Sequence, residues 1–270
     1  TCGFDQSDCY PCGDGLGQVF VDYNDASLPG LTLTLADAGV ALSATDEFGA
    51  SMASGDFDDD GYDDLAVGAP GHDGCGAVFV FKGGGGSNFE QLTFWRSILP
   101  SNITATAPCS HEIGRGLAVG DFNLDGVEDL LVGSPAWAEG FVDRFLGDGS
   151  GSGLGANTKN TDGFFAGPST GSRFGQSIAT TTPNDGDPRL AVYVGAPNAS
   201  NGGFSNAGVI QYYRDTTLIV EAGEDIDGGT PGTDHYFGSA LAASPQRLVI
   251  GRPGTTVDGL PDAGAVYVWE

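Results

Sequence analysis

Short apolar runs separated by glycine-rich turns extend along nearly the whole chain. Runs such as GAVFVF at 76–81 and GAVYVW at 264–269 are rich in β-branched and aromatic residues, a composition typical of strands. No segment keeps the period of a helix, and no apolar run approaches the length of a membrane-spanning segment. The 46 glycines and 14 prolines favour many tight turns, so the pattern predicts a nearly all-β protein.

The runs are organised in repeated units, each opened by a Phe-Gly or Ile-Gly pair. These pairs begin at residues 48, 113, 174 and 237, with spacings of 65, 61 and 63 residues. Each unit continues with a first strand-like run, a turn, a second run that closes on Gly-Ala-Pro or a variant of it, and a third run. A fourth run is visible at 89–95 and 216–222. Four short strands at a period of about 60 residues predict the blades of a β-propeller.

Two acidic loops, within 55–70 and 120–135, join the first and second runs of the first two units. Each loop places oxygen-bearing side chains at alternate positions around a glycine: Asp56, Asp58, Asp60 and Asp64 in the first, and Asp121, Asn123, Asp125 and Asp129 in the second. Ca²⁺ takes six to eight oxygen ligands, and alternate carboxylates around a tight turn let one short segment wrap the ion. Asp-rich turns also occur without metal, but the same spacing twice favours two calcium sites.

The loops differ from an EF-hand, because the position of its bidentate glutamate holds Val67 or Val132, inside an apolar run that predicts a buried strand. Instead, the Phe-Gly and Gly-Ala-Pro boxes around each loop resemble the FG-GAP repeats of integrin alpha-subunit propellers, over roughly 48–270. The resemblance implies a calcium-loaded β-propeller outside the cell, acting in adhesion or ligand binding. It also implies the metal ligands: Asp56, Asp58, Asp60, the Tyr62 carbonyl and Asp64 in one loop, and Asp121, Asn123, Asp125, the Val127 carbonyl and Asp129 in the other.

The later units depart from the metal-binding pattern. In the third unit Asp185 and Asp187 lie too close to the following strand, and Pro188 breaks the spacing. The corresponding segment of the fourth unit, SPQRLVIGRP at 244–253, has no carboxylate. We therefore expect two calcium ions, not four.

The N-terminal region bears on how a propeller of four blades closes. The last unit supplies three strands, and LTLTLA at 31–36 alternates with period two, so we expect it to be the missing outer strand. The run at 17–23 is then surplus. The predicted organisation is a Cys-rich segment, 1–16, followed by an FG-GAP propeller, 17–270, whose strands within 17–36 close the ring. The alternative is a partial propeller completed by another chain through an unpaired strand edge, so self-association stays open.

Charge and cysteines narrow the setting. Ten Lys and Arg against 36 Asp and Glu give a net charge of −26, which argues against a nucleic-acid partner and against anionic membrane surfaces. The odd number of cysteines leaves one free or bridged to a partner. We expect a Cys75–Cys109 disulfide and a second one between two of the three N-terminal cysteines, which are Cys2, Cys9 and Cys12. CYPC at 9–12 lacks the context of a redox or zinc motif. Disulfides indicate export, and we expect a mature extracellular or cell-surface chain without its signal peptide.

No catalytic constellation is evident in the sequence. GPSTG at 167–171 matches a nucleophile pattern but lacks the flanking strand and helix, and His72, His111 and His235 have no metal-ligand spacing. We expect a non-enzymatic module that binds an extracellular protein or glycan. Two alternatives stay open: a structural subunit of a cell-surface assembly completed by strand or blade sharing, and an accessory domain of a secreted hydrolase, since FG-GAP-like propellers also accompany phospholipases.

Overall fold

A computed structural model describes residues 17–22, 30–41, 43–84, 92–103, 109–149, 154–155, 164–183, 186–214, 217–222 and 232–269. These residues form five antiparallel sheets, and their helical content consists of three short 3-10 segments. The 3-10 segments are η1 (Leu35–Ala38), η2 (His72–Gly74) and η3 (Pro100–Asn102). None of the helices in these described segments is long and apolar enough to cross a membrane. The all-β prediction is confirmed.

Each of the four repeated units folds as one sheet of consecutive strands. The first blade contains β3 (Ser51–Gly55), β4 (Asp64–Ala69), β5 (Ala77–Lys82) and β6 (Thr93–Ile98). The second contains β7 (Leu117–Gly120), β8 (Asp129–Ser134), β9 (Phe141–Phe145) and β10 (Phe164–Ala166). The third contains β11 (Ser177–Thr181), β12 (Ala191–Ala196), β13 (Val209–Arg214) and β14 (Thr217–Ala222). The last sheet has three strands, β15 (Leu241–Ser244), β16 (Arg247–Arg252) and β17 (Ala265–Trp269).

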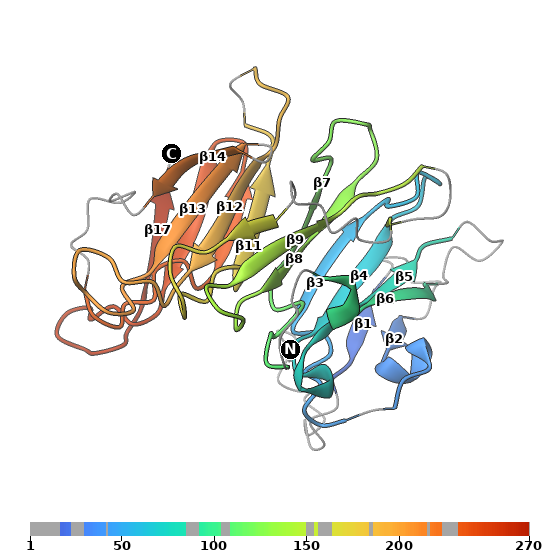
Figure 1. The fold of residues 1–270 in the computed structure, drawn as a ribbon, viewed down its shortest axis with the longest axis horizontal. Helices are drawn as coiled ribbons and strands as arrows, with labels where there is room; N and C mark the ends of the chain where they lie inside the picture. Colours follow the sequence, from blue (N-terminus) through green and yellow to red (C-terminus); the bar gives the residue numbers. More distant parts are fainter. Residues whose placement is uncertain are drawn as a thin grey trace.

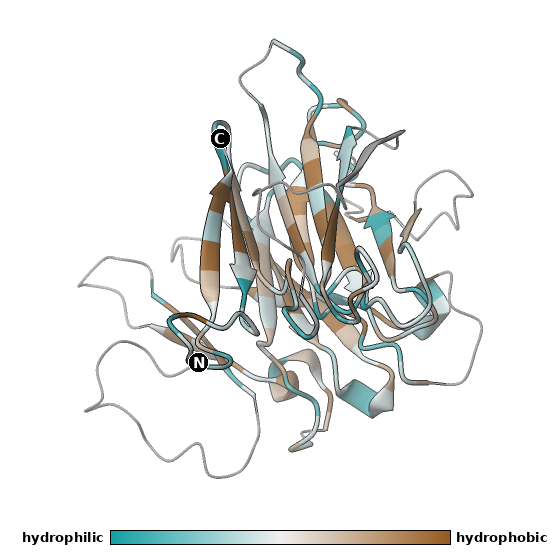
Figure 2. Ribbon diagram, turned by 90° about the vertical axis from the view of Figure 1, so that its left-hand side faces the viewer, coloured by the Kyte–Doolittle hydropathy of each residue, from teal (hydrophilic) through white to brown (hydrophobic). Residues whose placement is uncertain are grey.

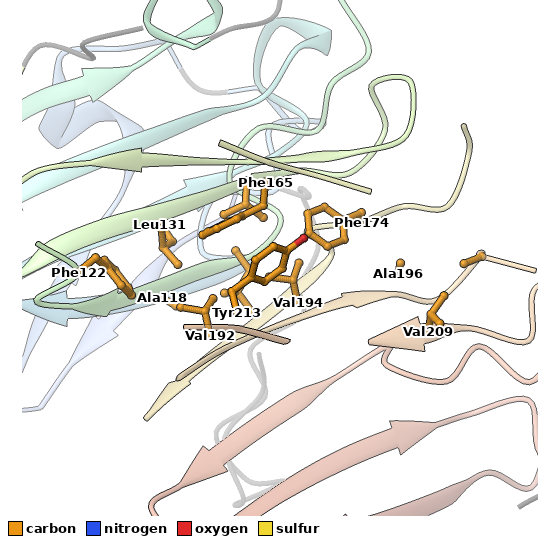
Figure 3. Packing of buried hydrophobic residues seen from close by; sticks show 13 residues of the cluster. Ala118, Phe122, Leu131, Phe165, Phe174, Val192, Val194, Ala196, Val209 and Tyr213 are labelled. Atoms are coloured by element: carbon orange, nitrogen blue, oxygen red, sulfur yellow. The ribbon is translucent and has the colours of Figure 1, made fainter. Parts of the chain in front are cut away.

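The blades stand side by side (Figure 1), and clusters of buried apolar residues span neighbouring blades. Every residue of β8 and β12 is buried, which explains why the centres of these second strands, Leu130–Val132 and Ala191–Val194, are apolar on both faces. One core cluster fills the space between the second and third blades, where the rings of Phe165 and Tyr213 lie 4.1 Å apart (Figure 3). Apolar positions follow the strands, and hydrophilic positions gather in the connecting loops (Figure 2).

The Phe-Gly pairs fasten each blade to the one before it. Gly175 and Gly238 have φ of 88° and 84°, in the left-handed region that favours glycine. Their carbonyl groups pass directly over the Gly-Ala-Pro box of the preceding unit. A Cβ at Gly133 or Gly195 would lie 2.1 Å from the carbonyl oxygen of Gly175 or Gly238, respectively. Both boxes of the motif therefore belong to one contact between neighbouring blades.

The N-terminal strands do not complete the last blade, so that prediction is wrong. β2 (Leu31–Leu33) pairs with β1 (Val19–Val21) in a separate two-stranded sheet, and the residues after it form η1 instead of more strand. This sheet packs on the first blade, at the opposite end of the row from β17 (Figure 1). The reason is that β1 stands to the first blade as the third strand of one blade stands to the next blade. Gly17, just before β1, lies against the backbone of Phe48, as Gly140, just before β9, lies against the backbone of Phe174. Among the described residues, these strands therefore do not close a ring.

The outer face of the last sheet is exposed. In β17, Val266 is 69% exposed and Val268 is 56% exposed, whereas Leu248 and Ile250 of β16 are buried against the third blade. Within the described part of the chain, no further sheet covers Val266 and Val268.

Candidate metal centres

The two acidic loops follow the same backbone path at equivalent places in two blades. The first joins β3 to β4 and the second joins β7 to β8. Each has two left-handed residues two positions apart: Asp59 and Gly61 at φ of 57° and 89°, and Leu124 and Gly126 at 60° and 93°. The aromatic residue that opens each loop, Phe57 or Phe122, is buried in the core and anchors the turn.

Three carboxylates converge in the first loop. Asp56, Asp58 and Asp60 each offer an oxygen, and these oxygens lie within 4.8 Å of one another. Asp56 accepts hydrogen bonds from the N–H groups of Asp60 and Gly61, at 3.1 and 2.8 Å. Asp60 Oδ1 accepts one from the N–H of Tyr62 at 3.0 Å. The turn therefore holds two of the three carboxylates, those of Asp56 and Asp60, through its own amides.

The second loop repeats this network with an amide in place of one carboxylate. Asp121 accepts from the N–H groups of Asp125 and Gly126, at 3.1 and 2.9 Å. Asp125 Oδ1 accepts from the N–H of Val127 at 2.9 Å. Asn123 Oδ1 accepts from the N–H of Asp125 at 3.1 Å, and the amide nitrogen of Asn123 donates to Asp125 Oδ2 at 2.8 Å. These hydrogen bonds place Asp121, Asn123 and Asp125 beside one another in the second loop.

The last carboxylate of each loop is fully buried and braces the loop against its blade. Asp64 accepts from the N–H groups of Phe57 and Gly83, at 3.1 and 2.9 Å. Asp129 accepts from the equivalent N–H groups of Phe122 and Gly147, at 3.0 and 2.8 Å. Burial raises the pKa of both carboxyl groups to about 6, although these hydrogen bonds oppose the shift. Each carboxylate oxygen keeps a further lone pair with which to bind a cation.

Asp58 shows that the first loop suits a cation. Its side chain is 0% exposed, and its Oδ1 is buried without a hydrogen-bond partner in the described structure. A buried carboxylate is costly unless its charge is compensated. Clustered carboxylate and carbonyl oxygens are the donors that Ca²⁺ prefers. The residues present therefore fit calcium.

Two further residues act on the first loop, and the sequence analysis missed both. The ammonium group of Lys82, at the end of β5, forms ion pairs with Asp58 and with Asp60, the latter at 3.1 Å. The hydrogen bond to Asp58 raises the pKa of Lys82. Glu128, in the second loop, accepts a hydrogen bond from the N–H of Asp56 at 2.9 Å and so links the two loops. The one sequence signal was that Lys82 takes the place of Leu146 between matching Phe and Gly residues.

Comparison with known proteins agrees with this arrangement. The family described as FG-GAP repeat matches residues 48–86 and 113–153, which contain the two loops. The chain carries FG-GAP repeats. It is 32% identical to Integrin alpha-6 of Gallus gallus over 180 residues, 63% of this chain and 15% of that protein. It is 34% identical to Integrin alpha-PS3 of Drosophila melanogaster over 159 residues, 56% of this chain and 14% of that protein.

A third similarity concerns an enzyme. The chain is 36% identical over 92 residues to Phosphatidylinositol-glycan-specific phospholipase D of Bos taurus, a match that covers 33% of this chain and 11% of the bovine protein. The chain therefore spans a small part of the length of each of these relatives.

A disulfide closes the segment that leads from the first FG-GAP unit toward the second. Cys75 and Cys109 form a disulfide with a Cα–Cα distance of 4.5 Å, which confirms the predicted pair. Next to it, the N–H of Ile113 donates to the carbonyl of Cys75 at 3.1 Å. Cys2, Cys9 and Cys12 lie outside the described residues.

The other candidate residues are dispersed. His72 Nδ1 lies 3.1 Å from Asp46 Oδ1, whereas His111 is buried beside the Trp137 ring, with 5.6 Å between centroids. In the third unit Asp187 is engaged by Arg189, which lowers the pKa of the Asp187 carboxyl to about 2. Asp185 lies outside the described residues.

Proposed function

We propose that the chain forms an extracellular ligand-binding β-propeller segment in which the first two FG-GAP units each hold one calcium ion. The predicted ligands would hold the ions: Asp56, Asp58, Asp60, the Tyr62 carbonyl and Asp64 in the first loop, and Asp121, Asn123, Asp125, the Val127 carbonyl and Asp129 in the second. Calcium would neutralise the converging carboxylates and so fix both loops. The similarity to integrin alpha subunits and the Cys75–Cys109 disulfide support an extracellular setting.

The observation that carries this proposal is the environment of Asp58. Its buried Oδ1 has no hydrogen-bond partner among the described residues, while Asp56 and Asp60 bring their oxygens within 4.8 Å of its carboxylate. The Lys82 ammonium compensates only part of this charge, at one oxygen each of Asp58 and Asp60, so the remaining negative charge is repulsive unless a further cation is bound. Metal binding and the local order of the loop should therefore be linked.

The calcium part of the proposal is tested by counting ions. Protein dialysed against calcium should contain two ions per chain by atomic emission, and an Asp58→Ala and Asp125→Ala double variant should contain none. A Ser200→Ala variant, remote from both loops in sequence, is the matched control. One or four ions in the unaltered chain would contradict the proposal.

The ligand-binding part requires a screen with chemically defined partners. The chain should bind a matrix protein or a glycan on an array in 2 mM calcium, a concentration chosen to be about saturating for a structural site. Binding should be lost in EDTA and restored by calcium. Equal binding in calcium and in EDTA would show that the loops do not organise the recognising surface.

A structural role in a larger assembly is the second candidate, and the exposed Val266 and Val268 favour it. Exposed apolar sheet faces mark association sites. A solution mass that rises with concentration, and does not rise in a Val266→Asp variant, would support this role over the first. The phospholipase D activity named for the bovine relative is not carried over, because the match covers 11% of that protein.

A further inference from the structure

The two loops share a backbone path but differ at one neighbouring position. Gly83 and Gly147 donate to Asp64 and Asp129 in the same way, which fixes the equivalence of the residues that precede them. The preceding residue is Lys82 in the first unit and Leu146 in the second. At this position the first loop has a cationic neighbour and the second an apolar one, and the cation that acts on the second loop, Arg144, does so on the buried Asp129.

Three side chains contact the ammonium group of Lys82. Its ammonium contacts Asp58 and lies 3.1 Å from Asp60 Oδ2. It also lies 5.6 Å from the centre of the Trp95 ring, a cation–π distance. The side chain is 32% exposed, and that of Asp58 is 0% exposed, so this is not a solvent-screened surface pair.

We propose that Lys82 is a built-in counter-cation of the first loop, and that it makes calcium bind there more weakly than in the second loop. This inference rests on the proposed function. The predicted side-chain ligands are four aspartates in the first loop and three aspartates with one asparagine in the second, so ligand charge alone would make the first loop the tighter site. Lys82 reverses that order, because calcium must share or displace its contacts with Asp58 and Asp60.

Two consequences follow from this arrangement. In low calcium the second loop fills first, while the ammonium group holds the carboxylates of the first loop together. As calcium rises, the first loop fills and Lys82 moves away from the Asp58 carboxylate. The pair of loops therefore responds to calcium over a wider concentration range than two equal sites.

The experiment is a calorimetric calcium titration of the full chain and of three variants in chelator-treated buffer. Lys82→Leu introduces the residue of the second loop, Lys82→Arg keeps the charge, and Leu146→Lys places the cation beside the second loop. Thermal melts in saturating calcium establish that each variant folds. An Asp125→Ala variant, which disables the second loop, assigns the weaker step to the first loop.

The unaltered chain should show two dissociation constants at least tenfold apart, with the weaker one retained in Asp125→Ala. Lys82→Leu should tighten that weaker constant at least tenfold, Lys82→Arg should change it less than threefold, and Leu146→Lys should weaken the tighter constant at least tenfold. Trp95 emission should change during the weaker step in the unaltered chain. Two constants unaffected by Lys82→Leu, within twofold, would overturn the inference while leaving the calcium proposal intact. Absence of calcium binding in every variant would overturn both.

Discussion

The close contact between the third and last blades predicts that a side chain at Gly195 destabilises the protein. In Gly195→Ala, the added Cβ would lie 2.1 Å from the carbonyl oxygen of Gly238 and 2.4 Å from Ser177 Oγ. That carbonyl already accepts a hydrogen bond from the Ser177 hydroxyl at 2.7 Å. The backbone around Phe237 must therefore move by about 1 Å or more to restore ordinary contact distances, which are near 3.5–4 Å.

Gly251 provides the matched control, because it holds the same position in the last blade. A Cβ there would have Ala240 Cβ, at 3.4 Å, as its nearest neighbour. Overpacking in a filled contact costs about 1–3 kcal/mol, so we expect Gly195→Ala to lower the free energy of unfolding by about 2–3 kcal/mol. Gly251→Ala should raise it by about 0.4–1 kcal/mol, because alanine restricts the unfolded chain.

Urea unfolding in saturating calcium, followed by tryptophan fluorescence, measures both effects. Amide hydrogen exchange adds the location, because β15 and β16 should lose protection in Gly195→Ala before the first two blades do. Equal destabilisation by the two substitutions would refute the reasoning. So would a Gly195→Ala variant within 0.5 kcal/mol of the unaltered chain, taken as about the size of an ordinary surface effect.

Three further predictions concern the metal, pH and the disulfide. Removing calcium from saturated protein should lower the melting temperature by about 10–20 °C, since a site at a hundredfold excess contributes about 2.7 kcal/mol, and Asp58→Ala should reduce this shift by less than half, because the first loop is the weaker site. The folded-state pKa values of Asp64 and Asp129 are raised from 3.8 to about 6, so in metal-free protein the protonated carboxyl groups favour the folded state. This contribution to the free energy of unfolding is complete below pH 3.8 and is lost as pH rises through 6. Melting temperature in EDTA should therefore fall between pH 4 and 7, a trend that Asp64→Asn should weaken and calcium should abolish. Replacing Cys75 and Cys109 by serine should cost about 3–4 kcal/mol in urea unfolding, from the 34-residue separation, and an unchanged midpoint would contradict the estimate.

The repeat pattern allowed much of this fold to be predicted, because it combines local strand composition with turn residues at fixed places. The four units and the paired loops followed from such signals, and the structure confirms the Cys75–Cys109 pair. Pairing over longer distances was harder. Alternation within 31–36 identifies a strand but carries no information about its partner. The strand pairs with the nearby run within 17–23 and not with the distant last blade.

The same distinction applies within the candidate site. Loop spacing alone brings Asp56 next to Asp60 and Asp121 next to Asp125, since each turn is built by hydrogen bonds between neighbours. Lys82 and Glu128 reach the first loop from another strand and from another blade. Only the packing of the sheets brings them there, so no local pattern could place them.

Cations also explain why the units differ in their expected dependence on calcium. Each of the first three units has an acidic turn between its first and second strands, and anionic turns need compensation. In the third unit Asp187 forms ion pairs with Arg189 at 2.6 Å and with Arg214 at 3.7 Å. The guanidinium groups of these two side chains therefore supply the compensating positive charge. In the first unit Lys82 supplies part of it beside Asp58. Calcium dependence should therefore be strongest in the second blade, weaker in the first and absent from the turn of the third, an order that hydrogen exchange in calcium and in EDTA would resolve blade by blade.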